Sequence, residues 1–196
     1  MSRKAEITRT TGETDIKVVL DIDGNGKAEI DTGIGFFDHM LTALSKHSGI
    51  DMDIVCKGDL QVDAHHSVED VGIVLGQAFN KAIGDKVGIR RYGSASIPMD
   101  EALGTASLDI SGRAYLVYDC EFADEFCGTM DTQLFEEFFR SFAFNAGITL
   151  HIACPYGAND HHKAEAMFKA LARALREATE TDPRFEGQIV STKGAL

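Results

Sequence analysis

The chain has 196 residues, of which 31 are acidic and 19 basic, and its formal net charge at pH 7 is −12. This length allows one compact domain with a buried core. The negative charge disfavours nucleic-acid binding, and no segment approaches the roughly 20 consecutive apolar residues that a membrane helix requires. The four cysteines form no CxxC pair, which favours reduced thiols in the cytoplasm over a disulfide framework or a zinc knuckle.

Strand and helix patterns follow one another along the chain in the same order twice. In the first half, strand-forming residues predict strands at 15–20, 27–31 and 52–57, and apolar residues at helical spacing predict helices over 36–44 and 65–82. In the second half, the same signals predict strands at 105–110, 114–119 and 149–153, and helices over 134–142 and 161–175.

The repeated order indicates an internal duplication. A His-His-x-x-Glu motif at 65–69 recurs at 161–165, an offset of 96 residues. Upstream, a Leu-Asp-Ile match and a Gly-Ile match keep the same order at offsets of 88 and 98, so the halves differ in loop length. The sequence predicts an α+β fold with two halves, 1–88 and 89–196, each a small mixed sheet covered by two helices, which together form one catalytic unit.

Two glycine-containing loops resemble ligand-binding motifs but lack a required residue. Residues 21–26 open like an EF-hand calcium loop, but Thr32 occupies the twelfth position in place of the bidentate Glu. A hairpin turn between two strands explains this loop better. Residues 33–35 lack the third glycine of a dinucleotide fingerprint, so we expect no nucleotide cofactor.

The doubled His-His-x-x-Glu motif carries the strongest chemical signal. On a helix, the first His and the Glu share a face, whereas the second His points about 100° away, so one motif can serve two metals. Imidazole with carboxylate suits manganese, iron or zinc, and the absence of thiolate disfavours a structural zinc site. A single copy is more often a solvated helix start, here with Asp160 as N-cap, but a second copy in register favours metal binding.

Three further histidines extend the candidate set. His39 follows Asp38, a cap or a hydrogen-bond partner, and His151 lies in a predicted strand; each alone is more often structural. His39 and His151 together with the two motifs supply six imidazoles and two carboxylates, enough for a dinuclear catalytic centre. His47 ends a predicted helix, where either the helix dipole or a ligand would favour a histidine.

Few cations are placed to bind an anionic substrate. The candidates are Arg90, Arg91, Arg113 and the C-terminal segment 191–194, in which Ser and Lys precede a glycine. Such a segment can cradle a phosphate, although most arginines and terminal lysines are only solvated.

Ordered motifs along the whole chain resemble those of the imidazoleglycerol-phosphate dehydratase family. They are Thr8–Thr14, Gly35–Met40, His65–Asp70, Arg91–Gly93, Ser111–Ala114, Asp160–Glu165 and Ser191–Gly194. The resemblance implies a ribosomal protein S5 domain 2-like fold with two β-β-β-α-β-α halves. It also implies a cytoplasmic hydro-lyase of histidine biosynthesis that forms imidazoleacetol phosphate, assembled as a shell of twenty-four subunits with active sites between subunits.

The resemblance also implies two Mn²⁺ per active site and a role for particular residues. The implied metal ligands are His39, His65, His66, Glu69, His151, His161, His162 and Glu165. The implied substrate and phosphate contacts are Glu13, His39, His47, Arg91, Arg113, Ser191 and Lys193. The catalytic candidates are Glu13, Glu69 and Glu165, with Glu13 as the acid/base. Ala64 departs from the family, which commonly has an acid there, and leaves open its effect on the first metal site.

Two other interpretations stay open. A dinuclear His/Glu site also activates water in metal hydrolases, for which phosphate release would be the signature. Alternatively, the histidines only join subunits of a non-catalytic, metal-dependent shell, an interpretation that leaves Glu13, Arg113 and Lys193 unexplained.

Overall fold

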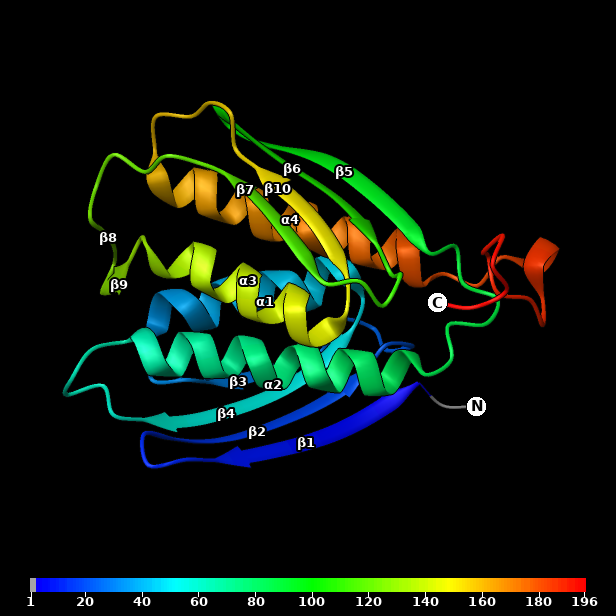
Figure 1. Cartoon of the computed structure of the whole chain (residues 1–196). Helices are drawn as coiled ribbons and strands as arrows, with labels where there is room; N and C mark the ends of the chain where they lie inside the picture. The colour runs from blue at the N-terminus through cyan, green and yellow to red at the C-terminus, as the bar shows by residue number, and fades with distance from the viewer. Residues whose placement is uncertain (1–2) are drawn as a thin grey trace.

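Four helices lie between two four-stranded sheets in the computed structural model, which describes residues 3–196 (Figure 1). The first half comprises β1 (Lys4–Thr10), β2 (Thr14–Asp21), β3 (Ala28–Asp31), α1 (Gly35–Ser48), β4 (Asp51–Gly58) and α2 (His65–Ile83). The second half comprises β5 (Tyr92–Met99), β6 (Ala102–Asp109), β7 (Tyr115–Asp119), α3 (Leu134–Ala146), β10 (Thr149–Ala153) and α4 (Asp160–Thr179). A short hairpin, β8 (Phe126–Cys127) and β9 (Met130–Asp131), precedes α3, and a 3₁₀ turn, η1 (Pro183–Phe185), follows α4. The predicted α+β class and the repeated β-β-β-α-β-α order are confirmed.

The two sheets have the same strand order, β1-β2-β4-β3 and β5-β6-β10-β7. In each, the last pair is parallel and the others are antiparallel. The predicted hairpin at Gly24–Gly26 is therefore wrong, because β4 separates β2 from β3. Asp51 at the start of β4 organises this crossing: its Oδ1 accepts the backbone N–H groups of Asn25 (2.7 Å) and Lys27 (2.8 Å).

The first strand of each half, β1 and β5, is absent from the pattern-based strand predictions. Both are edge strands, with a neighbour on one side only. In β1 the one fully buried residue is Ala5, and in β5 it is Gly93, so neither strand shows the run of large buried residues that marks a central strand.

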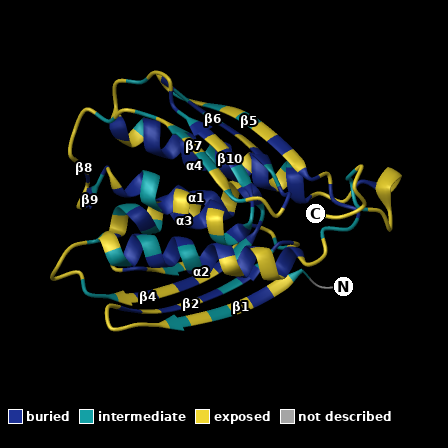
Figure 2. Cartoon of the chain, in the orientation of Figure 1, coloured by how far each residue is buried: buried dark blue, intermediate teal, exposed yellow. Residues whose placement is uncertain are grey.

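The helix layer joins the two halves into one core (Figure 2). Helix α2 packs on α3 and α1 on α4, so every helix contacts one from the other half. Phe138 of α3 meets both Phe37 of α1 and Phe168 of α4 at ring-centroid distances of 5.3 Å. At Gly76 of α2 a Cβ would lie 2.7 Å from the carbonyl oxygen of Phe142, so glycine permits the close approach of α2 and α3.

All four helices begin at the same end of the layer (Figure 1). Contacts between first turns fix this arrangement: Phe36 of α1 packs edge-on against Phe135 of α3 and His161 of α4. The N-termini of the four helices and the loops before them therefore form one surface. Both His-His-x-x-Glu motifs lie at this surface, in the first turns of α2 and α4. Among residues 3–196, no helix is long and apolar enough to cross a membrane.

Candidate active site

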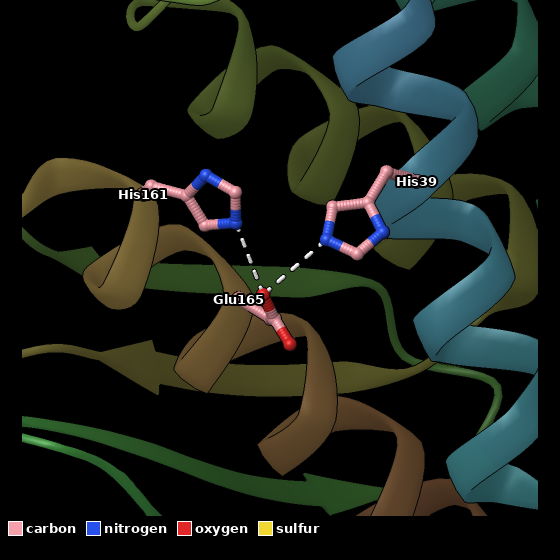
Figure 3. Close-up of side chains that lie close together, drawn as sticks. All are labelled: His39, His161 and Glu165. Atoms are coloured by element: carbon pink, nitrogen blue, oxygen red, sulfur yellow. Dashed lines mark hydrogen bonds and ion pairs between the residues drawn. The ribbon is translucent and has the colours of Figure 1, made fainter.

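One cluster joins α1 to α4 at this surface (Figure 3). Because His161 and Glu165 are four residues apart on α4, they share a face, and His161 Nε2 lies 3.1 Å from Glu165 Oε2. Packing of α1 on α4 brings His39 Nε2 to 3.3 Å from the same oxygen. The three ligand atoms lie within 4.8 Å of one another, close enough to share one ion.

The cluster has the electrostatics of a cation site. Glu165 is buried, and its other oxygen, Oε1, is 2.6 Å from Lys169 Nζ. Burial alone would raise the pKa of Glu165, but Lys169, together with His161 and His39, lowers the pKa below its ordinary value. The carboxylate thus stays ionised beside two imidazoles. This nitrogen and oxygen donor set, without thiolate, fits Mn²⁺ or a similar divalent ion.

The first-half motif forms a looser group at the start of α2. His65 Nε2 is 3.8 Å from Glu69 Oε2, the same i,i+4 pairing as on α4. The second histidine, His66, points elsewhere, as helical geometry predicts: its Nδ1 is 3.0 Å from Asp59 Oδ2, and its Nε2 is 3.8 Å from Glu13 Oε1. The hydrogen bond to Asp59 raises the pKa of His66. A cleft of about 580 Å³ lies beside His65, between the starts of α2 and α3.

The second-half motif diverges in the same way. His162 turns away from Glu165, and its Nδ1 is 2.8 Å from Glu101 Oε2. This contact lowers the pKa of Glu101 to about 2 and raises that of His162. The N-cap of α4 is Asn159, whose side chain accepts the His162 N–H, so the prediction of Asp160 as the cap is wrong. Asp160 is buried within the first turn instead.

The starts of the other two helices also differ in detail. Asp38 accepts the N–H and the hydroxyl of Thr32 at 2.9 and 2.6 Å, so its side chain closes the loop before α1, and neither hydrogen bond involves His39. Ala64 occupies the N-cap of α2 and offers no side-chain acceptor. Asp63 supplies a side-chain acceptor in place of the N-cap residue, because its Oδ1 accepts the backbone N–H of His65 at 2.8 Å.

Two candidate histidines lie outside these groups. His151 is exposed on the outer face of the second sheet, in β10. His47 lies near the C-terminus of α1, where burial and then the charge of Lys169 lower its pKa, against the opposing effect of Glu165.

Four of the candidate residues for binding an anionic substrate lie together near the C-terminal end of α4. Arg91, Arg113, Ser191 and Lys193 line one open cleft of about 740 Å³. Arg91 is buried: it forms a two-pronged pair with Asp109 at 2.7 and 3.0 Å, and its Nη1 donates to the Val190 carbonyl at 2.6 Å. It thereby holds the C-terminal segment in place.

Arg113 and Lys193 are exposed to solvent in this cleft. The Arg113 side chain is 68% exposed, with Nη2 3.6 Å from Asp109 Oδ2. Ser191 Oγ accepts the backbone N–H of Lys193 at 3.2 Å, which closes a turn around the serine. Arg90 points away from the cleft, toward Glu177 on α4 and Glu180 directly after this helix.

Comparison with known proteins identifies the family. A model of the imidazoleglycerol-phosphate dehydratase family matches residues 32–175. The chain belongs to the imidazoleglycerol-phosphate dehydratase family. Imidazoleglycerol-phosphate dehydratases from Acetivibrio thermocellus and Gluconobacter oxydans are each 60% identical to it, over 196 and 195 residues; they span this whole chain, and it covers 100% and 98% of theirs.

Solved structures of imidazoleglycerol-phosphate dehydratases share the fold. The crystal structure from Staphylococcus aureus is 42% identical, with a TM-score of 0.83 over 91% of this chain and 99% of its own. The structure from Pyrococcus furiosus is 39% identical, with a TM-score of 0.82 over 97% of this chain and 100% of its own. Dehydratase membership thus agrees with the sequence, the repeated topology and the histidine-rich surface.

Several charged residues of this dehydratase chain contact candidate site residues but were not predicted from the sequence. Among them are Asp59, Glu101, Asp109 and Lys169. The contact of Lys169 with Glu165 could have been predicted from the sequence, because residues four apart on one helix share a face. Glu101 could also have been predicted, because it lies 88 residues after Glu13, the offset of the upstream repeat.

Proposed function

We propose that this chain dehydrates D-erythro-imidazoleglycerol phosphate to imidazoleacetol phosphate and water, in the cytoplasm and as a step of L-histidine biosynthesis. Membership of the dehydratase family supports the activity. The observation that carries the proposal is the group of His39, His161 and Glu165, in which a buried, ionised carboxylate lies beside two imidazole nitrogens.

The proposed cofactor is Mn²⁺, with two ions per active site. The proposed ligands are those implied by the resemblance: His39, His65, His66, Glu69, His151, His161, His162 and Glu165. When bound, the ions supply positive charge that stabilises negative charge on the substrate's imidazole ring. The diverging pairs, His65 with His66 and His161 with His162, support two ions better than one, because each pair presents its rings in different directions.

We propose that each active site takes residues from more than one subunit. His161 lies in the first turn of α4, whereas the backbone N–H of Arg91 donates to the carbonyl of Ala178 near the end of this helix. The proposed metal cluster and phosphate cleft are therefore about 25 Å apart along α4. A substrate of a few bonds spans only roughly 10 Å. One chain cannot therefore hold both ends of it.

A closed assembly of identical subunits would bring the two parts of the site together. The proposed shell of twenty-four subunits would place the phosphate cleft of one chain beside the metal residues of another. In that arrangement the halves 1–88 and 89–196 act as one catalytic unit, because each contributes histidines at the same end of the helix layer.

The chain's own residues account for binding and proton transfer. Arg113, Lys193 and Ser191 would hold the phosphate, with Arg91 fixing the segment that carries Ser191. Glu13 is the proposed acid/base, because it is exposed on the β1–β2 turn and its Oε1 is 3.8 Å from His66 Nε2. In its protonated form it would give a proton to the hydroxyl on carbon three, which leaves as water. The resulting carboxylate would then take the proton from carbon two of the glycerol chain, which gives the enol of the ketone product and restores Glu13.

The direct test is metal depletion and repletion. The purified protein is stripped of metal, Mn²⁺ is restored, and formation of imidazoleacetol phosphate is followed together with particle size. Manganese-dependent formation of this ketone supports the proposal. Release of inorganic phosphate would indicate a metal hydrolase instead, and assembly without turnover would indicate a structural shell.

A further inference from the structure

The second histidine of each motif is held by a carboxylate on the Nδ1 side of its ring. In the first half, His66 Nδ1 is 3.0 and 3.2 Å from the two oxygens of Asp59. In the second half, His162 Nδ1 is 2.8 Å from Glu101 Oε2. An ionised carboxylate can only accept a hydrogen bond, so Nδ1 must carry the proton in both rings. Nε2 is then the nitrogen left with a free lone pair.

The two carboxylates come from different places in the fold. Asp59 directly follows β4, whereas Glu101 lies in the β5–β6 turn. Glu101 is the repeat counterpart of Glu13, since both immediately precede the second strand of their half, at an offset of 88. The counterparts contact opposite sides of their histidines: Glu13 approaches Nε2 of His66 at 3.8 Å.

Both residues are themselves anchored, Glu101 through its side chain and Asp59 through its backbone. Glu101 Oε1 accepts the backbone N–H groups of Ala158 (3.0 Å) and Asn159 (2.7 Å), which leaves Oε2 for His162. The backbone N–H of Asp59 donates to the carbonyl of Glu13 at 3.1 Å. Each residue therefore links a connection between strands to a helix start, which limits rotation of the histidine.

We propose that Asp59 and Glu101 are positioning residues that fix His66 and His162 in the Nδ1-protonated form, with Nε2 presented as the metal-binding atom. The inference rests on the proposed metal site and adds two residues to it. The two halves reach the same imidazole orientation with non-equivalent acids, which leaves Glu13 free for proton transfer.

Glu101→Gln isolates the effect at Nδ1. The amide oxygen of Gln can still accept from Ala158 and Asn159, but its NH₂ group faces Nδ1 as a donor and favours the opposite tautomer of His162. Loss of such a partner typically weakens metal affinity about 10- to 100-fold. Asp100→Asn is the matched control, because Asp100 carries the same charge in the same turn but lies 3.8 Å from Nε2 and does not contact Nδ1.

The experiment titrates metal-stripped wild-type protein and the Glu101→Gln, Asp59→Asn and Asp100→Asn variants with Mn²⁺ alone, detecting the free ion by electron paramagnetic resonance. Thermal unfolding and particle size of the metal-stripped variants identify any that are misfolded. We expect weakened binding in folded Glu101→Gln and, as an independent second test, in Asp59→Asn, with a clearly smaller loss of affinity in Asp100→Asn.

Three results would overturn the inference. Wild-type affinity in Glu101→Gln would show that the contact does not orient the ligand. An equal loss in Asp100→Asn would assign the effect to charge alone. Absence of Mn²⁺ binding by the wild type would instead refute the proposed metal site, on which the inference depends.

Discussion

The proposed sharing of active sites between subunits makes a quantitative prediction for shells of mixed composition. His161→Ala removes a proposed metal ligand at the start of α4, and Lys193→Ala removes a cation from the proposed phosphate cleft near the other end of this helix. Each variant alone should be inactive. In shells assembled from equal amounts of both, a site is intact when its metal residues come from a Lys193→Ala subunit and its cleft from a His161→Ala subunit. Random mixing gives about one quarter of wild-type activity.

The assay uses two affinity tags. The variants are co-expressed, shells that carry both tags are isolated by tandem purification, and the specific rate of imidazoleacetol phosphate formation is compared with wild type. A mixture of the two separately assembled shells is the control and should stay inactive. If each site were built within one chain, every site would retain one defect, so inactive mixed shells of wild-type size would refute the reasoning.

Three further outcomes are expected. Glu13→Gln should keep the bound manganese but lose turnover, measured on one sample by metal analysis and product formation; near-normal turnover would remove Glu13 from the mechanism. Lys169→Met should raise the pKa of Glu165, because Lys169 lowers it, so the acid limb of the pH profile for Mn²⁺ binding should move to higher pH, whereas an unmoved limb would contradict this coupling. Gly104→Ala should lower the free energy of unfolding by about 1–3 kcal/mol, because a Cβ there would lie 2.3 Å from the backbone of α4, while Gly35→Ala, with no atom within 4 Å, should have little effect in the same denaturant titration.

Helical periodicity made much of the candidate site predictable. His161 with Glu165 and His65 with Glu69 meet because residues four apart on a helix share a face, whatever the rest of the fold does. The contact of His39 with Glu165 was not predictable in this way, because it depends on α1 packing against α4. Local periodicity says nothing about which helices become neighbours.

Local sequence patterns also fail to predict which strands pair. The turn residues at Gly24–Gly26 predicted a reversal of the chain, but not that β4 would enter between β2 and β3. The edge strands β1 and β5 were missed because their buried positions hold Ala5 and Gly93, which carry little hydrophobic signal. Glu101 was not predicted for a different reason: it follows Glu13 by 88 residues, whereas the histidine motifs that mark the repeat are 96 residues apart.

The shared helix layer constrains how such a chain could have arisen. Separating the halves would strip Phe37 from Phe138 and α2 from α3, which would expose the apolar faces of all four helices. An ancestral single half would therefore have needed a second copy of itself to cover its helices. A gene duplication would turn that dimer contact into an internal one and leave the two copies free to acquire different residues, as Glu13 and Glu101 illustrate.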